Sequence, residues 1–136
     1  MTQLPERFAS AAERLVGTPF RLHGRTADHG LDCVGVVLAA LRNCGVTADM
    51  ARLYGLRNAS ISAFLPLAAQ LGLVEAQGPP RRGDVLLVIA GPAQHHLLVV
   101  TGPDHFVHAH AGLRRVVVQR GITAWQCARH WRLSDR

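Results

Sequence analysis

The chain has 136 residues, of which 49% are hydrophobic and 18% are charged, a composition typical of soluble globular proteins. This length is enough for one domain with a sizeable core, and we interpret residues 1–136 as a single domain. No apolar stretch approaches the length that crosses a bilayer, which excludes a membrane-spanning helix. The first residues lack the pattern of a signal peptide, so we expect cytoplasmic synthesis without a Sec-type export route.

The net charge is +6, and every basic residue is an arginine. A basic surface favours the approach of an anionic polymer, such as a nucleic acid or a cell wall. The arginines are scattered, however, and aromatic residues make up only 5% of the chain. Because single-strand binders interleave basic and aromatic residues along one groove, the composition argues against a nucleic-acid partner.

Apolar residues near the N-terminus recur at helical spacing between Phe8 and Val16. This spacing predicts a helix over residues 6–16, which the sequence Gly17-Thr18-Pro19 ends. Residues 20–31 follow as a loop rich in glycine, histidine and arginine.

The apolar run that follows this loop predicts a second helix, over residues 33–44. Asp32 is a good N-cap residue, and Gly45 stands just beyond the last turn. The predicted helix is apolar nearly all round. We therefore expect it to be buried in the middle of the domain.

The next part of the chain predicts less regular helical structure. Residues 47–60 form a polar stretch with room for a turn or two of helix. A further helix is expected to begin at Ser60 or Ser62 and to end at Gly72, although Pro66 fits only near a helix start. The apolar residues on its buried face are Ile61, Phe64, Leu65, Ala68 and Leu71.

After a segment rich in turn-forming residues at 78–84, the pattern changes to short apolar and β-branched runs. Gly, Pro and Asp separate these runs, which is typical of antiparallel strands joined in a meander. The predicted strands cover residues 85–90, 96–101, 105–109, 115–119 and 128–133. Helices first and strands second predict an α+β fold, with the buried central helix packed on a C-terminal antiparallel sheet.

Cys33 stands where the polar loop becomes the apolar helix. At the start of a helix the dipole favours the thiolate, which is the form that attacks carbonyl groups. We therefore expect Cys33 to be a nucleophile, although a cysteine in an apolar run more often only packs. The other two cysteines, Cys44 and Cys127, form no CxxC pair and are interpreted as core residues.

Five of the eight histidines fall within residues 95–110. Antiparallel pairing about the turn at residues 102–104 is expected to bring His96 close to His108. A cysteine nucleophile needs a base and the base needs an orienting partner, and this hairpin can supply both. His95 points to the opposite face of the strand, so only one of the two neighbours can face Cys33. The spacing to His108 favours His96.

Five segments, in this order, resemble motifs of the NlpC/P60 peptidases, which are papain-like cysteine peptidases of bacterial cell walls and phages. They are Gly17-Thr18-Pro19-Phe20, Leu31-Asp32-Cys33-Val34-Gly35, Arg82-Gly83-Asp84-Val85-Leu86, His96-Leu97-Leu98-Val99-Val100-Thr101-Gly102 and Phe106-Val107-His108-Ala109. The resemblance covers most of residues 10–120 and implies a papain-like NlpC/P60 fold. The Asp-Cys-Val-Gly form resembles the phage-tail and gene-transfer-agent branch.

The resemblance implies a triad in which Cys33 is the nucleophile, His96 the general base and acid, and His108 the residue that orients His96. The implied reaction is hydrolysis of an amide bond in a peptidoglycan stem peptide, without a metal or other cofactor. The branch also implies delivery to the cell wall on a phage-like particle, with phage-tail or gene-transfer-agent proteins as partners.

The resemblance also implies substrate-binding positions. Asp32 would bind the free amine of the substrate, a role that competes with capping the helix. Phe20 stands where the family has a tyrosine, and Val34 stands where it has a serine. We expect these two departures to alter specificity more than chemistry.

Two other interpretations fit the same residues. His108 and His110 lie two apart on one predicted strand and so share a face. With His95 or His96, and with Cys33 or Asp104, they could bind zinc in a metal-dependent hydrolase. The chain could instead be a non-catalytic component of a phage-type particle that keeps the fold for assembly. The presence of all three triad residues argues against this second alternative.

Overall fold

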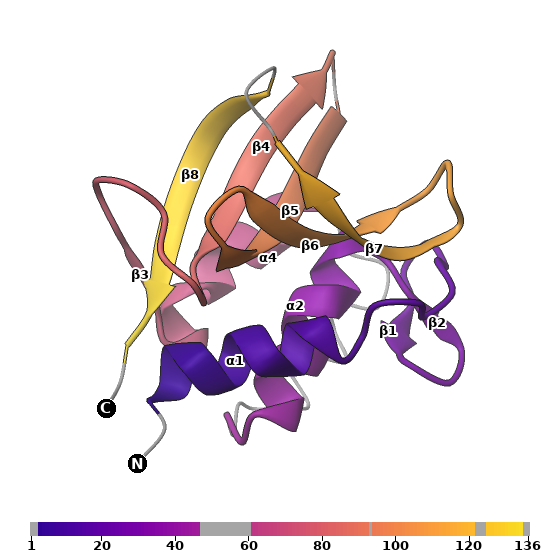
Figure 1. Cartoon of the computed structure of the whole chain (residues 1–136), viewed down its shortest axis with the longest axis horizontal. Helices are drawn as coiled ribbons and strands as arrows, with labels where there is room; N and C mark the ends of the chain where they lie inside the picture. Colours follow the sequence, from indigo (N-terminus) through magenta and orange to yellow (C-terminus); the bar gives the residue numbers. More distant parts are fainter. Residues whose placement is uncertain (1–2, 47–60, 93, 122–124, 135–136) are drawn as a thin grey trace.

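The computed structural model describes residues 3–46, 61–92, 94–121 and 125–134. Its helices pack against a six-stranded antiparallel sheet (Figure 1). The helices are α1 (Leu4–Glu13), α2 (Cys33–Asn43) and α4 (Ile61–Phe64). The strands, in their order across the sheet, are β3 (Leu73–Glu75), β8 (Gln126–Leu133), β4 (Val85–Gly91), β5 (Gln94–Gly102), β6 (His105–His110) and β7 (Arg115–Arg120). This is the α+β arrangement that the sequence predicts.

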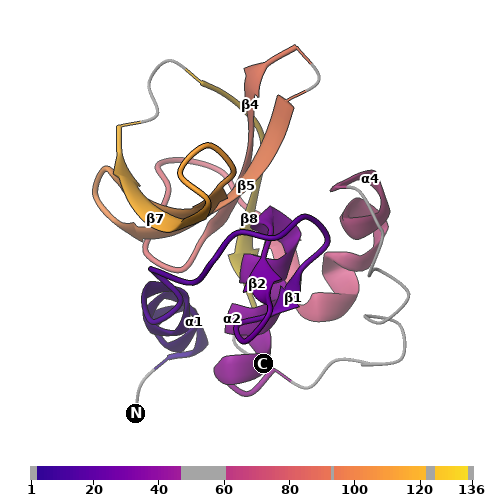
Figure 2. The ribbon, with the colours of Figure 1, turned by 90° about the vertical axis from the view of Figure 1, so that its right-hand side faces the viewer.

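α2 confirms the predicted central helix. Every residue from 34 to 41 is buried, as expected for a helix without a polar face. α1 lies alongside α2, and the sheet covers both (Figure 2). Among the described residues, no helix is long and apolar enough to cross a bilayer.

α1 begins and ends earlier than the sequence predicts. Pro5 lies in its first turn, where a backbone N–H is not needed, so the helix can start at Leu4. The buried face of α1 includes Phe8 and Ala12, and Leu15 remains in the core although it follows the last helical residue.

The helix predicted to end at Gly72 is broken into pieces. α4 covers only Ile61–Phe64, and two 3₁₀ turns, Leu65–Leu67 and Ala69–Leu71, replace its continuation. Pro66 is the physical reason, because its ring cannot donate a hydrogen bond and clashes with the preceding turn of an α-helix. The predicted end is correct, since Gly72 has a φ of 89°. The turn of helix expected within residues 47–60, and a cap at Ser60, lie outside the described residues.

Strands β4 to β7 form the predicted meander, in which each strand pairs with the next. β8 does not extend this row, because it returns to pair with β4 on one side and β3 on the other. The sequence does not predict β3, since a three-residue strand is too short to show alternation. The loop ahead of α2 also contains a small hairpin, formed by β1 (Arg25–Thr26) and β2 (Gly30–Leu31).

The two faces of the sheet carry separate apolar clusters. Along β5, Leu97 and Val99 point toward the helices and belong to the main core. Leu98 and Val100 belong to a second cluster, against which the half-buried Trp125 packs. Because successive side chains of a strand alternate between faces, these two sets lie on opposite sides of β5.

The fully buried carboxylate of Asp84 attaches β8 to the start of β4. Both Asp84 oxygens accept hydrogen bonds of 2.9 Å from the guanidinium of Arg132. The Nε2 atom of His130 lies 2.6 Å from Oδ2, and the backbone N–H of Arg81 donates to the same oxygen. Burial raises the pKa of Asp84, but the hydrogen bonds from Arg132, Arg81 and His130 outweigh it and lower the pKa overall. Removing a partner would leave a buried charge uncompensated.

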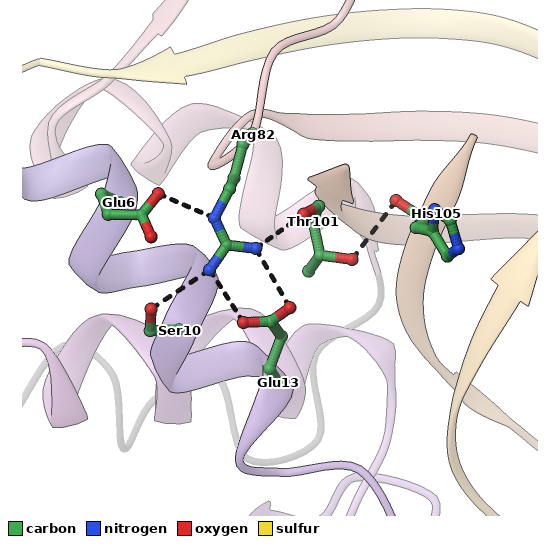
Figure 3. A network of polar contacts seen from close by, with 6 residues as sticks. All are labelled: Glu6, Ser10, Glu13, Arg82, Thr101 and His105. Carbon is green, nitrogen blue, oxygen red and sulfur yellow. Dashed lines mark hydrogen bonds and ion pairs between the residues drawn. The ribbon is translucent and has the colours of Figure 1, made fainter. Parts of the chain in front are cut away.

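Arg82, the residue two positions before Asp84, attaches the same turn to α1 (Figure 3). Its Nε donates to Glu6 at 2.7 Å, and its two terminal nitrogens donate to Glu13 at 2.8 and 3.0 Å. The remaining bonds go to the hydroxyl of Ser10 at 3.2 Å and the carbonyl of Thr101 at 2.6 Å. The guanidinium thus uses its whole planar fork, which an ammonium group cannot reproduce.

Arg82→Lys should therefore destabilise the protein although it keeps the charge. We expect the free energy of unfolding to fall by about 1–2 kcal/mol, a modest value because solvent screens these partly exposed groups. Urea denaturation measures the loss. Arg42→Lys is the matched control, because Arg42 is exposed at the end of α2, and its effect should stay within about 0.5 kcal/mol. Equal losses in the two variants would contradict the role given to Arg82.

Candidate active site

Cys33 is the first residue of α2 and is half-buried. Asp32 precedes it in an extended conformation, and its Oδ1 atom accepts a hydrogen bond of 2.8 Å from the N–H of Gly35. The predicted N-cap is thereby confirmed. The positive end of the helix dipole lies at this turn and favours negative charge on a sulfur there.

The loop ahead of α2 packs tightly against the first turn of the helix. A Cβ atom at Gly35 would lie 2.1 Å from the carbonyl oxygen of Gly24, so only glycine allows this approach. The Oδ2 atom of Asp32 accepts a hydrogen bond of 2.8 Å from the N–H of His23, in the same loop. The glycine of the Asp-Cys-Val-Gly segment is thus required for the loop to dock beside Cys33.

The three residues predicted to bind substrate lie in different surroundings. Phe20 is half-buried, forms a bridge with Leu31, and donates its backbone N–H to Arg114 at 2.9 Å. Val34 is only 3% exposed and packs in the main core. Both oxygens of Asp32 accept backbone N–H groups, as described above. A substrate contact of any of the three stays a prediction.

His96 and His108 are brought together, as the hairpin predicts. Their ring centroids are 6.2 Å apart. His96 is half-buried and His108 is only 2% exposed, whereas His95 is exposed. Strand alternation gives His96 the orientation of Leu98, so the pair lies beside the second apolar cluster.

α2 packs against β5 and β6, the strands that carry the two histidines. It does so from the face of Leu97 and Val99, whereas His96 has the opposite orientation along β5. The structure thus brings the histidines together and puts Cys33 at the start of the neighbouring helix. A direct approach of the Cys33 sulfur to His96 stays a prediction.

Two further aromatic rings complete this group, and sequence reasoning missed one of them. The indole of Trp125 is nearly parallel to the His96 ring at 5.9 Å, with an interplanar angle of 28°. It meets the His108 ring edge-on, also at 5.9 Å. The ring centroid of His110, a member of the histidine cluster in the sequence, lies 5.7 Å from that of His108. In the sequence, Trp125 is an isolated aromatic residue before the last predicted strand, with no local sign of a role.

The surroundings of both histidines favour their neutral form. Burial lowers the pKa of His96, and the neighbouring His110 and His95 lower it further. Burial also lowers the pKa of His108, against the opposing effect of the hydrogen bond that the ring makes to the side-chain oxygen of Gln119. A neutral imidazole can accept a proton, so these rings are suited to base catalysis near neutral pH.

The other two cysteines lie at the end of α2 and on β8. Cys44 caps the end of α2 and donates its thiol to the carbonyl of Leu41 at 3.3 Å. Cys127 is exposed on β8, so the interpretation of this residue as a core residue is wrong. It lies near the start of β8, where the strand pairs with Val88 but carries no buried side chain.

A metal site was the alternative interpretation of the histidine cluster. Over the described parts of the chain, no group of three or more His, Cys, Asp or Glu side chains is arranged to hold a metal ion. The aromatic contacts of His96 and His108 are instead with each other, with Trp125 and, for His108, with His110.

No family model and no curated protein sequence matches the chain. Solved structures do match it. NlpC2 from Trichomonas vaginalis superposes with a TM-score of 0.70 at 17% identity, over 98% of this chain and 47% of that one. A lipoprotein-like NLP/P60-family protein from Staphylococcus aureus gives a TM-score of 0.68 at 12% identity, over 98% and 42%.

The NlpC/p60 domain of the peptidoglycan hydrolase SagA matches over 95% of this chain and 98% of its own length, with a TM-score of 0.56 and 17% identity. The chain thus spans about half the length of the first two proteins and nearly all of the SagA domain. These likenesses agree with the fold that the five motifs imply. The chain has the NlpC/P60 fold.

Proposed function

We propose that the protein is a cysteine peptidase or amidase that hydrolyses amide bonds of peptidoglycan stem peptides. One observation carries the proposal: a cysteine at the capped start of a buried helix and a pair of neighbouring histidines occur together on an NlpC/P60 fold. The name of SagA, a peptidoglycan hydrolase whose NlpC/p60 domain is matched along nearly its whole length, supports this substrate class. Delivery on a phage-like particle is part of the same proposal.

In the proposed reaction, His96 takes the proton of the Cys33 thiol and the sulfur attacks the carbonyl carbon of the amide. The C–N bond then breaks, and His96 returns the proton to the leaving amine, which leaves a thioester on Cys33. Water, activated by His96, attacks the thioester, and the C–S bond breaks to release the carboxylic acid. His108 orients the His96 ring through both steps.

The start of α2 would stabilise the charge that develops on the substrate. The backbone N–H of Cys33 lies at the positive end of the helix and would bind the oxyanion. Each oxygen of Asp32 has two lone pairs, so it can accept a hydrogen bond from a substrate amine besides those from Gly35 and His23. Capping the helix and binding an amine are therefore compatible roles for Asp32.

Cys33→Ala should abolish the release of fragments from purified peptidoglycan, because no other group here replaces the nucleophile in the proposed reaction. The fold should survive, since the side chain is small and at a half-buried position. Mass analysis of the released fragments measures activity and also identifies the bond that is cut. Cys127→Ser, a change at an exposed cysteine, is the control and should retain activity. Hydrolysis of peptidoglycan by Cys33→Ala would contradict the proposed function.

The pH profile should follow the protonation of His96. Because burial and the neighbouring His110 and His95 lower its pKa from 6.5, the neutral base persists to lower pH than for an ordinary histidine. We expect kcat/KM to hold as the pH is lowered to about 6.5 and to fall only below that. An acid limb with its midpoint above this value would contradict the assignment of His96 as the base.

Alkylation separates an enzyme from a non-catalytic particle component. Desolvation raises the pKa of the thiols of Cys44 and Cys127, so both should react slowly with iodoacetamide near neutral pH. An activated Cys33 should be modified first, as mass spectrometry of digested protein would show. If all three thiols react at one slow rate, the chain is better interpreted as an assembly component.

A further inference from the structure

The buried ring of His108 has two nitrogens with very different surroundings. Its Nε2 atom lies 2.7 Å from the side-chain oxygen of Gln119 on β7. Its Nδ1 atom is buried and, among the described residues, has no hydrogen-bond partner. A buried polar atom without a partner is costly, so its presence calls for an explanation.

The orientation of the Gln119 carboxamide indicates which nitrogen of His108 carries the proton. Its amide nitrogen donates to the carbonyl of Gly121 at 3.4 Å, which turns the amide oxygen toward His108. The reversed orientation would bring two oxygens, those of Gln119 and Gly121, against each other. An amide oxygen only accepts, so the Nε2 atom of His108 must be the donor.

The strand register explains why the side chain of Gln119 reaches the His108 ring. Gln119 pairs with Phe106, and His108 pairs with Val117, so the two side chains share one face of the β6–β7 pair. Trp125 meets the His108 ring from the side, and the ring is almost fully excluded from solvent. Water therefore cannot readily replace the amide as a partner of Nε2.

We propose that Gln119 is a positioning residue that holds His108 as the Nε2–H tautomer, which leaves Nδ1 as a hydrogen-bond acceptor for the His96 ring. A neutral imidazole carries one N–H, so a proton held at Nε2 leaves the other nitrogen bare. When His96 donates one N–H to this atom, its other nitrogen is left as the base. The ring centroids are 6.2 Å apart, and such catalytic hydrogen bonds often tighten only with substrate bound.

The neutral charge of Gln119 is part of this role. A carboxylate at the same place would also accept from Nε2, but it would favour the imidazolium form of His108. Both nitrogens would then carry protons, and Nδ1 could no longer accept from His96. In the described part of the chain, the ionisable rings that lie beside the His108 ring are those of His96 and His110.

The tautomer of His108 can be tested by a measurement that does not depend on enzymatic activity. Nitrogen NMR of labelled protein at neutral pH should show His108 with the proton on Nε2. In Gln119→Leu, which removes the acceptor at similar volume, this single tautomer should be lost. Gln3→Leu is the matched control, because Gln3 is exposed and its side chain makes no capping bond to α1. A proton on Nδ1 in the unaltered protein, or an unchanged His108 spectrum in Gln119→Leu, would overturn the inference.

The kinetic consequence rests on the proposed function. Gln119→Leu should lower kcat by about 10–100-fold, the loss typical when the hydrogen-bond partner of a metal-bound histidine is removed, and leave KM within about twofold. Gln119→Glu keeps the volume and the acceptor, so it guards against a simple failure of Gln119→Leu to fold. Its activity should be low at pH 7 and recover at higher pH, as His108 loses its extra proton.

A purely structural role of Gln119 would give losses that follow the melting temperature and do not depend on pH, and that result would refute a positioning role. If the unaltered protein releases no peptidoglycan fragments, the proposed function fails. The NMR spectra would still decide whether Gln119 holds the tautomer of His108.

Discussion

A helix that is apolar on every side is stable only where protein surrounds it, and this constraint sets the position of α2. The sheet covers it from β5 and β6, α1 lies alongside, and the backbone of Gly24 closes on Gly35. The one part of such a helix that can carry polar chemistry is its capped end. Asp32 and Cys33 stand there, so the burial of α2 also sets where the thiol lies.

The opposite face of β5 and β6 has a different character. There the second apolar cluster lies beside the rings of His96, His108 and Trp125. Burial lowers the pKa of both histidines. Because the His108 ring is almost fully excluded from solvent, its hydrogen bond to Gln119 is electrostatically stronger than the same bond would be in water. The sheet thus separates a stabilising core on its helix side from a group of titratable rings on the other.

Two charged residues of one turn, Arg82 and Asp84, connect the helices to the sheet. Arg82 forms hydrogen bonds with α1, and Asp84 accepts hydrogen bonds from Arg132 on β8. Both groups bind several partners at once, which is how charges can be removed from water without a large loss of stability. The turn before β4 therefore connects α1, β4 and β8, three elements distant in sequence.

Local signals in the sequence predict α2 with its capped start, the meander from β4 to β7 and the approach of the two histidines. Periodicity, capping residues and turn residues act over a few neighbouring positions, so they can be recognised without the fold. The sequence also carried the motif order that indicates the NlpC/P60 fold. The folded structure alone shows that β8 inserts between β3 and β4 and that Cys127 is exposed. It alone also shows that Trp125 and Gln119 lie against the histidines. These contacts join segments with no common local pattern, and strand register and side-chain direction across the assembled sheet determine them.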